Sequence, residues 1–400
     1  MNKPLRLDQV GEASPTPEEL VARARALIPT LRERAKLGES GRQIPPETIA
    51  DFKEAGLFRV LQPKRWGGYE MHPNVFFDIV MALGEGDMSS AWVYSVVAVH
   101  PWQIACYDER AQQEVWGEDD STLASSTYMP GGKATPVEGG FRFSGRWGYS
   151  SGSAHCKWVL LGGMILNPDG QPTQGTFLLP RSDYEIVDAW DTPGLRGTGS
   201  DDIVVNDVFV PDYRVMSGMG GFLCEHPGHA VNDGALYRLP YGQVFCRAVS
   251  TPAIGALQGM IDQMQETAKT RANLFGMRTT QDPIATLAIA EAQNEVDQLK
   301  LILQRNFDVL WSYAERRELP PVELRSQYRF QASLPPERVS IAAARLFKAV
   351  GGAAVYNKNP YGRIMNDIMV GRQHIANQFE IYGRGWGSVL MGQENKDYFL

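Results

Sequence analysis

The segment at residues 194–200 reads Gly-Leu-Arg-Gly-Thr-Gly-Ser, and the apolar run Val-Phe-Val-Pro follows at residues 208–211. It closes a region, starting near Ser121, in which glycine, serine, threonine and short apolar runs predominate. Apolar runs separated by turn residues are typical of strands, and here they occupy residues 141–145, 158–161, 176–179 and 203–205. We therefore predict a small β domain over residues 121–215.

The chain before this region has helical patterns. Thr16-Pro17-Glu18-Glu19 forms a capping box with a proline in the first turn, and apolar spacing from Leu20 to Leu31 predicts one amphipathic helix. Further helices are predicted over about 46–55, where Gly56 ends the helix, and over about 74–86 and 90–116. These elements predict an N-terminal helical domain over residues 1–120.

Helical periodicity returns after a loop rich in glycine, histidine and proline at residues 217–242. It predicts helices over about 250–277, 284–316, 337–350 and 374–391. We therefore expect a mostly α protein with a central β domain and a C-terminal helical bundle over residues 216–400.

Composition narrows the classes of partner. The chain has 400 residues, of which 43% are hydrophobic, and its net charge of −7 argues against nucleic acid or an anionic membrane as partner. The polar start at Met1-Asn2-Lys3-Pro4 lacks the apolar core of a secretion signal, and we expect no run long enough to span a bilayer. Four dispersed cysteines offer no metal-ligand spacing, so we predict no metal and a cytoplasmic location.

The order of the parts and several local motifs resemble the acyl-CoA dehydrogenase fold over nearly the whole chain. The matching segments are Gly56–Pro63 with Trp66-Gly67-Gly68, the residues 194–200 and 208–211 quoted above, and Gly351-Gly352 with Arg363-x-x-x-Asp367. The resemblance implies an N-terminal helical domain, a β-barrel-like middle domain and a C-terminal four-helix bundle.

The residues that decide the chemistry differ from those of the dehydrogenases. Dehydrogenases of this fold commonly carry a carboxylate base shortly after the Arg-Asp turn, where this chain has His374-Ile375-Ala376-Asn377. The segments Ser90–Ser95 with His100, Ala124–Thr127, and Gly148–Gly152 with His155 instead resemble the oxygenase components of two-component flavin monooxygenases. Those enzymes include 4-hydroxyphenylacetate hydroxylase and the steroid-degradation phenol (secoandrostane) hydroxylase. The resemblance implies ortho-hydroxylation of a phenol by reduced flavin and O2 through a C4a-hydroperoxyflavin.

Three catalytic residues are implied by this resemblance. His100 would polarise or deprotonate the phenol, although its apolar neighbours also suit a core histidine. Ser126 would contact the substrate oxygen, or simply bond the backbone of a strand. His374 would lie at the C4a edge of the flavin, although a helix-capping histidine would be unremarkable there.

The resemblance also implies residues that hold the flavin. Ser151, beside Ser150, would bond flavin N5, unless it only forms a turn before Gly152. Trp92, Tyr149 and Trp147 suit either the core or the flanks of the flavin. The remaining implied residues are Arg271 and Phe275, which would reach the flavin of a neighbouring subunit, and Gly351 and Gly352, which would let the backbone approach the cofactor or merely cap a helix.

Implied partners follow from the same comparison. No nucleotide-binding glycine motif follows a strand in a βαβ unit, so a separate NAD(P)H:flavin reductase would deliver reduced FMN or FADH2, and O2 would be the co-substrate. A homotetramer is implied. Gly242 follows Leu239-Pro240-Tyr241 where the phenylacetate enzyme has a substrate-binding arginine, and Ala376 replaces a tyrosine; both changes favour a neutral, bulkier phenol. The polar residues 393–397 match no segment of either relative.

Three alternatives remain open from the sequence. The chain could be an acyl-CoA dehydrogenase with tightly bound FAD. It could be an oxygenase of the same fold that attacks nitrogen or sulfur of a heteroaromatic compound. It could also be a non-catalytic flavin carrier or structural subunit.

Overall fold

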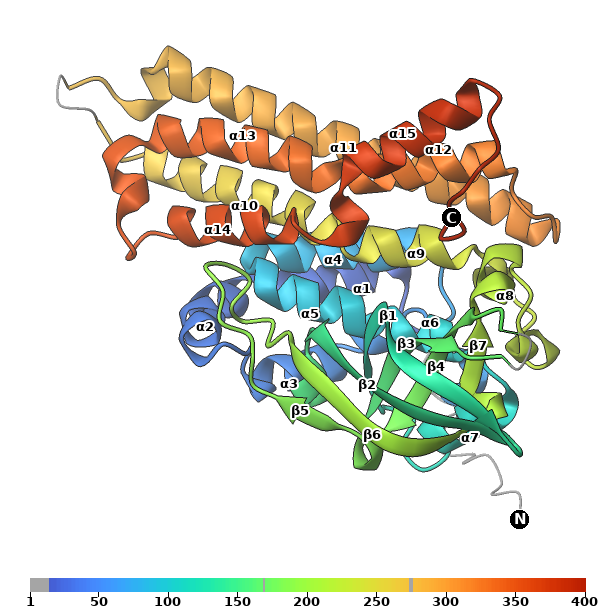
Figure 1. Cartoon of the computed structure of the whole chain (residues 1–400). Helices are drawn as coiled ribbons and strands as arrows, with labels where there is room; N and C mark the ends of the chain where they lie inside the picture. Colours follow the sequence, from blue (N-terminus) through green and yellow to red (C-terminus); the bar gives the residue numbers. More distant parts are fainter. Residues whose placement is uncertain (1–13, 168–169, 273–275) are drawn as a thin grey trace.

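The computed structural model describes residues 14–167, 170–272 and 276–400. Figure 1 shows a twisted sheet on one side, helices α4 (Pro73–Gly86) and α5 (Met88–Ala98) beside it, and long helices of the C-terminal half across the opposite side. The other helices before the sheet are α1 (Pro17–Ala26), α2 (Ile28–Gly41), α3 (Pro46–Glu54), α6 (His100–Ile104) and α7 (Glu109–Trp116). The predicted mostly α fold with a central sheet is confirmed, whereas the division at residues 120 and 215 stays a prediction.

The first helix differs from its prediction. The capping box is present, since Thr16 Oγ1 accepts from Glu19 N at 3.2 Å and Thr16 N donates to Glu19 at 2.8 Å. The single helix predicted through Leu31 is wrong, because α1 ends at Ala26 and α2 begins at Ile28. Pro29 explains the break, since its ring displaces the carbonyl four residues earlier and it has no N–H for the helical ladder. The stretch predicted over 90–116 likewise divides into α5, α6 and α7, with Pro101 in the first turn of α6.

The sheet contains seven strands in the order β5-β6-β2-β1-β3-β4-β7. Only β1 and β3 pair in parallel among the described strands, and the other neighbours are antiparallel. Phe143 and Phe177 stack with ring centroids 4.1 Å apart in its core. The strands are β1 (Ala124–Val137), β2 (Gly140–Ser150), β3 (Trp158–Ile165), β4 (Thr173–Pro180), β5 (Glu185–Val187), β6 (Asp201–Pro211) and β7 (Val215–Ser217).

The C-terminal half is helical, and α10, α11, α13 and α14 pack together as a four-helix bundle. The sequence pattern located α10, α11, α13 and α15 but did not predict α9, α12 or α14. The loop expected over residues 217–242 is also wrong in part, because it contains α8. The helices are α8 (Gly218–Leu223), α9 (Tyr241–Ala248), α10 (Thr251–Ala268), α11 (Pro283–Glu315), α12 (Val322–Ser333), α13 (Pro335–Val350), α14 (Tyr361–Gly371) and α15 (Phe379–Leu390).

Helices α4 and α10 join the two helical parts of the chain at very close range. A Cβ atom at Gly255 would lie 2.2 Å from the carbonyl oxygen of Met81, and one at Gly259 would lie 2.5 Å from that of Glu85. Only glycine permits such an approach of one backbone to another. We expected no segment long enough to span a bilayer, but the helical segment Tyr241–Ala268 is long and apolar enough by length and composition. Within its most apolar stretch, 94% of the residues are buried inside the protein, as in a core helix.

Candidate functional site

Three residues predicted from separate parts of the chain meet beside α5. The indole Nε1 of Trp92 donates to Ser151 Oγ at 3.2 Å, and the ring of His374 lies edge-on to Trp92 with centroids 5.8 Å apart. Burial, aided by the nearby Arg329 guanidinium, lowers the pKa of His374 to about 4. His374 is therefore neutral at physiological pH.

The neutral tautomer of His374 follows from its capping contact. Nδ1 accepts from the backbone N–H of Ala376 at 3.1 Å, at the start of a short 3₁₀ turn. An accepting nitrogen carries no proton, so Nε2 holds the N–H and can donate. The capping interpretation and the donor role are therefore compatible in one side chain.

Two hydroxyls that were not predicted extend this cluster. Ser151 Oγ lies 2.7 Å from Ser200 Oγ, and Ser200 Oγ lies 2.6 Å from Thr198 Oγ1. Thr198 Oγ1 in turn donates to the carbonyl of Leu195 at 2.8 Å. Both hydroxyls belong to the glycine-rich segment 194–200, which the sequence identified as a motif without assigning a role to its side chains.

A buried carboxyl on α14 fixes the glycine-rich segment. Asp367 Oδ1 accepts from the backbone N–H of Leu195 at 2.6 Å, and Asp367 is 3% exposed. Burial and then the nearby Asp87 carboxylate raise the pKa of Asp367 to about 8. The Arg-Asp motif therefore connects the helical bundle to the hydroxyls beside Ser151.

His100 lies in a second, more buried cluster. It is 0% exposed, and its Nδ1 lies 3.3 Å from the hydroxyl of Tyr128, which donates to Gln103 Oε1 at 2.5 Å. Burial lowers the pKa of His100 to about 3, although the nearby Gln103 side chain, which favours the protonated ring, opposes this. Because the Tyr128 proton goes to Gln103, the phenolic oxygen accepts from Nδ1–H, and Nε2 is left as an acceptor. This Nε2 finds no hydrogen-bond partner among the described residues.

Three further serines, Ser125 and Ser126 on β1 and Ser150 on β2, are neighbours in sequence of the residues in these two clusters. Ser150 Oγ donates to Ser125 Oγ at 3.3 Å, so Ser150 joins the two strands, and both serines are 0% exposed. Ser126 follows on β1 and is also buried. Tyr128, which contacts His100, lies two residues further along the same strand, a spacing that could have identified it.

The two aromatic residues near Ser151 have different environments. Trp147 is fully buried in the sheet core and donates to the carbonyl of Gly162 at 2.8 Å, so it is a core residue. Tyr149 is 65% exposed, adopts a left-handed backbone with φ of 68°, and lies edge-on to Trp190. Such a conformation is rare for a bulky residue and often marks a functional site.

Three of the residues expected to reach the flavin of a neighbouring subunit, Arg271, Gly351 and Gly352, lie together at the end of α13. The Arg271 guanidinium donates to the carbonyl of Val350, next to Gly351 and Gly352. Gly351 has φ of 68° and ψ of −151°, a combination that is open only to glycine. Phe275 lies outside the described residues. Among the described residues, no hydrogen bond or ring contact joins this group to His374 or His100.

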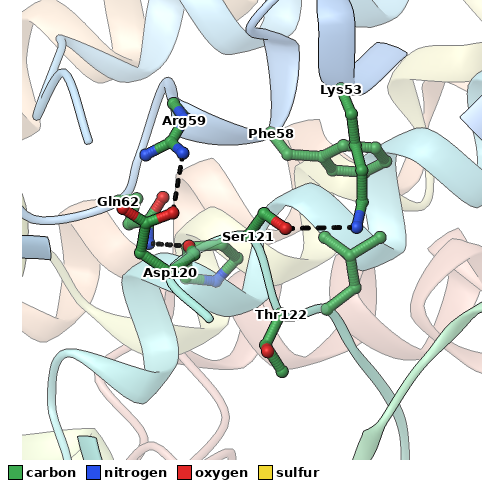
Figure 2. Close-up of a pocket in the computed structure, with 9 residues that line it drawn as sticks. Lys53, Phe58, Arg59, Gln62, Asp120, Ser121 and Thr122 are labelled. Atoms are coloured by element: carbon green, nitrogen blue, oxygen red, sulfur yellow. Dashed lines mark hydrogen bonds and ion pairs between the residues drawn. The ribbon is translucent and has the colours of Figure 1, made fainter. Parts of the chain in front are cut away.

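A small pocket is lined by Pro101, the residue that follows His100 in the chain, together with residues of α3, the 57–62 segment and the 120–123 segment. Figure 2 shows Arg59 and Gln62 bonded to Asp120, each at 2.8 Å, and Lys53 bonded to Ser121 at 3.4 Å. Its volume of about 50 Å³ is too small for an aromatic ring. The pocket is therefore not the candidate substrate site.

The fold implies a flavin, and the side chains around Trp92 fit one. An indole and three adjoining hydroxyls combine a stacking surface with hydrogen-bonding groups, as an isoalloxazine ring requires. Beside His374, the buried Arg329 donates to the carbonyl of Ala376 at 3.0 Å and leaves Nε and one terminal nitrogen without a described partner. The guanidinium of Arg329 stacks on the ring of Tyr382, with 3.3 Å between Cζ and the ring centroid, so Arg329 is part of the packing beside His374. No group of three or more His, Cys, Asp or Glu residues suited to a metal ion occurs in the described part of the chain.

Comparison with known proteins agrees with this arrangement. Residues 248–379 match the family described as acyl-CoA dehydrogenase, C-terminal domain. The chain is 37% identical to the oxygenase subunit HsaA of the flavin-dependent monooxygenase of Rhodococcus jostii (strain RHA1), over 90% of this chain and 96% of that protein. It is 27% identical to the oxygenase component of p-hydroxyphenylacetate 3-hydroxylase of Acinetobacter baumannii, over 98% of this chain and 94% of that one.

Solved structures give the same result. The crystal structure of the HsaA monooxygenase from M. tuberculosis superposes with a TM-score of 0.92 at 36% identity, covering 96% of this chain and 100% of that chain. These relatives are monooxygenases, so the acyl-CoA dehydrogenase alternative loses its support. The chain therefore belongs to the oxygenase components of the flavin-dependent monooxygenases with the acyl-CoA dehydrogenase fold, which act with reduced flavin and O2.

Proposed function

We propose that this oxygenase hydroxylates an uncharged phenol at the ortho position, and that His100 is the residue that activates the phenol. The observation that carries the proposal is the buried Nε2 of His100, which lacks a described partner while Nδ1 is occupied by Tyr128. A phenolic O–H would give this acceptor the hydrogen bond that it lacks. Ser126, buried on the neighbouring strand, is proposed as the second contact to the substrate oxygen.

His374 has the complementary role in this proposal. Its Nε2–H is the donor of the neutral ring, because Nδ1 is occupied by the Ala376 N–H. A fixed donor next to Trp92 and Ser151 would stabilise negative charge that develops on oxygen during the reaction. In this proposal, His100 accepts a proton or a hydrogen bond from the substrate, and His374 donates a hydrogen bond.

The cofactor would be held by residues from two groups. Trp92, with Ser151 beside Ser150, would flank the ring, and Tyr149 would cover its exposed side; Arg271, Phe275, Gly351 and Gly352 are proposed to reach the flavin of a neighbouring subunit in a homotetramer. Reduced FMN or FADH2, when bound, supplies the electrons with which O2 delivers one oxygen atom to the ring and the other to water. The protein's part is to orient the phenol, exclude water and place the proton donors.

The names of the relatives support the proposal of a partner protein. Several of them are named as oxygenase subunits or components, which supports a separate partner protein that reduces the flavin. We propose an NAD(P)H:flavin reductase for that role and a cytoplasmic location. Gly242 in place of an arginine supports a substrate without a carboxylate.

The test compares wild type with His100→Gln, each given chemically reduced FMN and O2 with a panel of uncharged phenols. We expect the rate of catechol formation to fall by roughly 10²-fold or more in His100→Gln while release of H2O2 continues, because general-base catalysis contributes about that much. His229→Gln is the matched control, since the His229 ring bonds the backbone carbonyl of Tyr237 and lies edge-on to His226, and we propose no role for it in the reaction. Equal loss of catechol and H2O2 in His100→Gln would reject the assigned role.

A further inference from the structure

Gln103 follows His100 by three residues on α6 and is almost as deeply buried. Residues at this spacing lie on the same side of a helix, so the amide of Gln103 lies on the side of the imidazole ring. Gln103 is 2% exposed, and its Oε1 accepts from the Tyr128 hydroxyl at 2.5 Å. A buried amide is costly unless its polar atoms are bonded. The bond from Tyr128 therefore gives this amide a partner directly beside the candidate catalytic histidine.

Tyr128, on β1, is held in place by two aromatic residues of α9. Tyr241 and Phe245 are one helical turn apart, and their rings are parallel to within 3°. Tyr128 lies edge-on to both rings, with centroids 5.5 Å and 4.7 Å away. Such packing holds a ring in a single rotamer. The hydroxyl of Tyr128 therefore keeps its place 3.3 Å from Nδ1 of His100.

The Tyr128 hydroxyl also keeps its proton. Burial raises the pKa of Tyr128 above its ordinary value of 10, although the nearby Ser126, Tyr241 and Gln103 side chains oppose this. A neutral hydroxyl has one proton to donate and lone pairs with which to accept. Because Gln103 Oε1 takes the proton, the lone pairs of Tyr128 are left for the Nδ1–H of His100. The chain of hydrogen bonds runs from His100 through Tyr128 to Gln103.

The direction of this chain suits a histidine that takes up a proton. When Nε2 accepts a proton, the ring becomes positively charged, and the hydrogen bond from Nδ1 to Tyr128 becomes charge-assisted and stronger. Gln103 strengthens that bond further, because a hydroxyl that donates to one acceptor is polarised into a better acceptor itself. Burial lowers the pKa of His100 to about 3, and Gln103 is the side chain that opposes this fall.

We propose that Tyr128 and Gln103 are positioning residues of the reaction, which hold His100 as the tautomer with a bare Nε2 and stabilise its protonated ring. The inference rests on the proposed function, because it takes His100 as the group that accepts the phenol proton. Both residues act at Nδ1, on the opposite edge of the ring from Nε2, so neither needs to touch the phenol. Two uncharged side chains have the role that a carboxylate has beside the histidine of a catalytic triad.

Gln103→Leu tests the chain of hydrogen bonds at its far end. Without Oε1, the proton of Tyr128 turns to His100 Nδ1, and the ring proton moves to Nε2. Tyr128→Phe removes the hydroxyl, and the double variant removes both partners. Nitrogen-15 resonances of labelled histidine distinguish protonated from bare ring nitrogens, and His100→Gln identifies the His100 signals among the six histidines. Catechol and H2O2 formed from 4-ethylphenol with reduced FMN and O2 measure the reaction.

Two variants are matched controls for these changes. Gln62→Leu removes another amide that is 2% exposed, and this amide donates to the carbonyl of Asp120 at 2.8 Å. Tyr184→Phe removes a buried hydroxyl that has no hydrogen-bond partner among the described residues. We expect the His100 resonances and the catechol rate of both controls to match the wild type. Gln103→Met, with an unbranched side chain of similar length, repeats the test in a second background.

We expect Gln103→Leu to carry the ring proton of His100 on Nε2. Its kcat for catechol should fall roughly 10²-fold, the contribution of general-base catalysis, while H2O2 release continues. The KM for 4-ethylphenol should change less, because the phenol oxygen can still accept from Nε2–H. The double variant should regain roughly tenfold in kcat, the factor that corresponds to one hydrogen bond, since Tyr128 no longer enforces the wrong tautomer.

Three results would overturn the inference: a protonated Nε2 of His100 in the wild type, a bare Nε2 in Gln103→Leu, or a double variant no faster than Gln103→Leu. The proposed function fails separately, if His100→Gln forms catechol at the wild-type rate. In that event the nitrogen-15 spectra still decide whether Gln103 and Tyr128 set the tautomer of His100.

Discussion

Asp367 should make the stability of this protein depend on pH in an unusual direction. Its pKa of about 8 in the folded protein, caused first by burial and then by Asp87, compares with an ordinary value of 3.8. The folded state therefore binds a proton that the unfolded state releases between about pH 4 and pH 8. Stability falls as pH rises through that window, because the folded protein must either keep the proton or bury a charge.

The size of the effect follows from the shift. Each pKa unit corresponds to about 1.4 kcal/mol, so a shift of roughly four units sets an upper bound of about 6 kcal/mol on the loss of stability between pH 4 and pH 8. Asp367→Asn retains the carbonyl oxygen that accepts from Leu195 N–H but cannot ionise. We expect this variant to match the wild type near pH 4, to exceed its free energy of unfolding by about 1–2 kcal/mol at pH 5, and to exceed it by a few kcal/mol near pH 8.

Urea unfolding followed by tryptophan fluorescence at pH 5, 6.5 and 8 measures the difference. Asp367→Ala is the control, since it removes the acceptor as well as the charge and should be less stable than Asp367→Asn by about 1–3 kcal/mol at every pH. It should also weaken binding of reduced FMN, because Leu195 supports Thr198, which bonds Ser200 and through it Ser151. Parallel pH profiles for the wild type and Asp367→Asn would refute this reasoning.

Three further outcomes are expected. Ser151→Ala leaves the buried Trp92 N–H without its acceptor, so reduced-FMN binding should weaken by about 1–3 kcal/mol in an anaerobic titration; unchanged affinity would place the flavin elsewhere. The pKa of His100 is about 3 in the folded protein, whereas its ordinary value is 6.5. The stability of the wild type should therefore fall as the pH is lowered from 6.5 to 4, and more steeply than that of a folded His100→Phe variant. Urea unfolding measures this difference. Pro29→Ala should join α1 and α2 and increase the helical signal in circular dichroism; an unchanged signal with a full loss of stability would show that the break is required for packing.

The fold was predictable wherever side-chain patterns report burial directly. Glycine and turn residues between short apolar runs located four of the strands, and the capping box located the start of α1. Helix α12 was missed for a physical reason, because its buried face carries Arg325 and Arg329. A search for apolar periodicity cannot find a helix whose inward side chains are charged.

The candidate site was predictable only through the family resemblance. Trp92, Ser151 and His374 do lie together, although no spacing in the sequence requires it. Thr198, Ser200 and Asp367 were missed because their roles depend on contacts between segments far apart in the chain. Gly242 was noted only as a missing arginine, whereas its close contact with Phe399 needs the three-dimensional path of the last residues.

In the proposed mechanism, the two histidines His100 and His374 use one physical environment for two opposite chemical functions. Burial keeps both His100 and His374 neutral, with pKa values of about 3 and about 4. Their partners then select different tautomers, because Tyr128 leaves His100 Nε2 bare while the Ala376 N–H leaves His374 Nε2 protonated. An oxygenase of this kind needs an acceptor for the phenol proton and a donor for the developing charge on oxygen. Desolvation alone would make both residues inert, so the proposed function depends on the hydrogen-bond partners as much as on the histidines themselves.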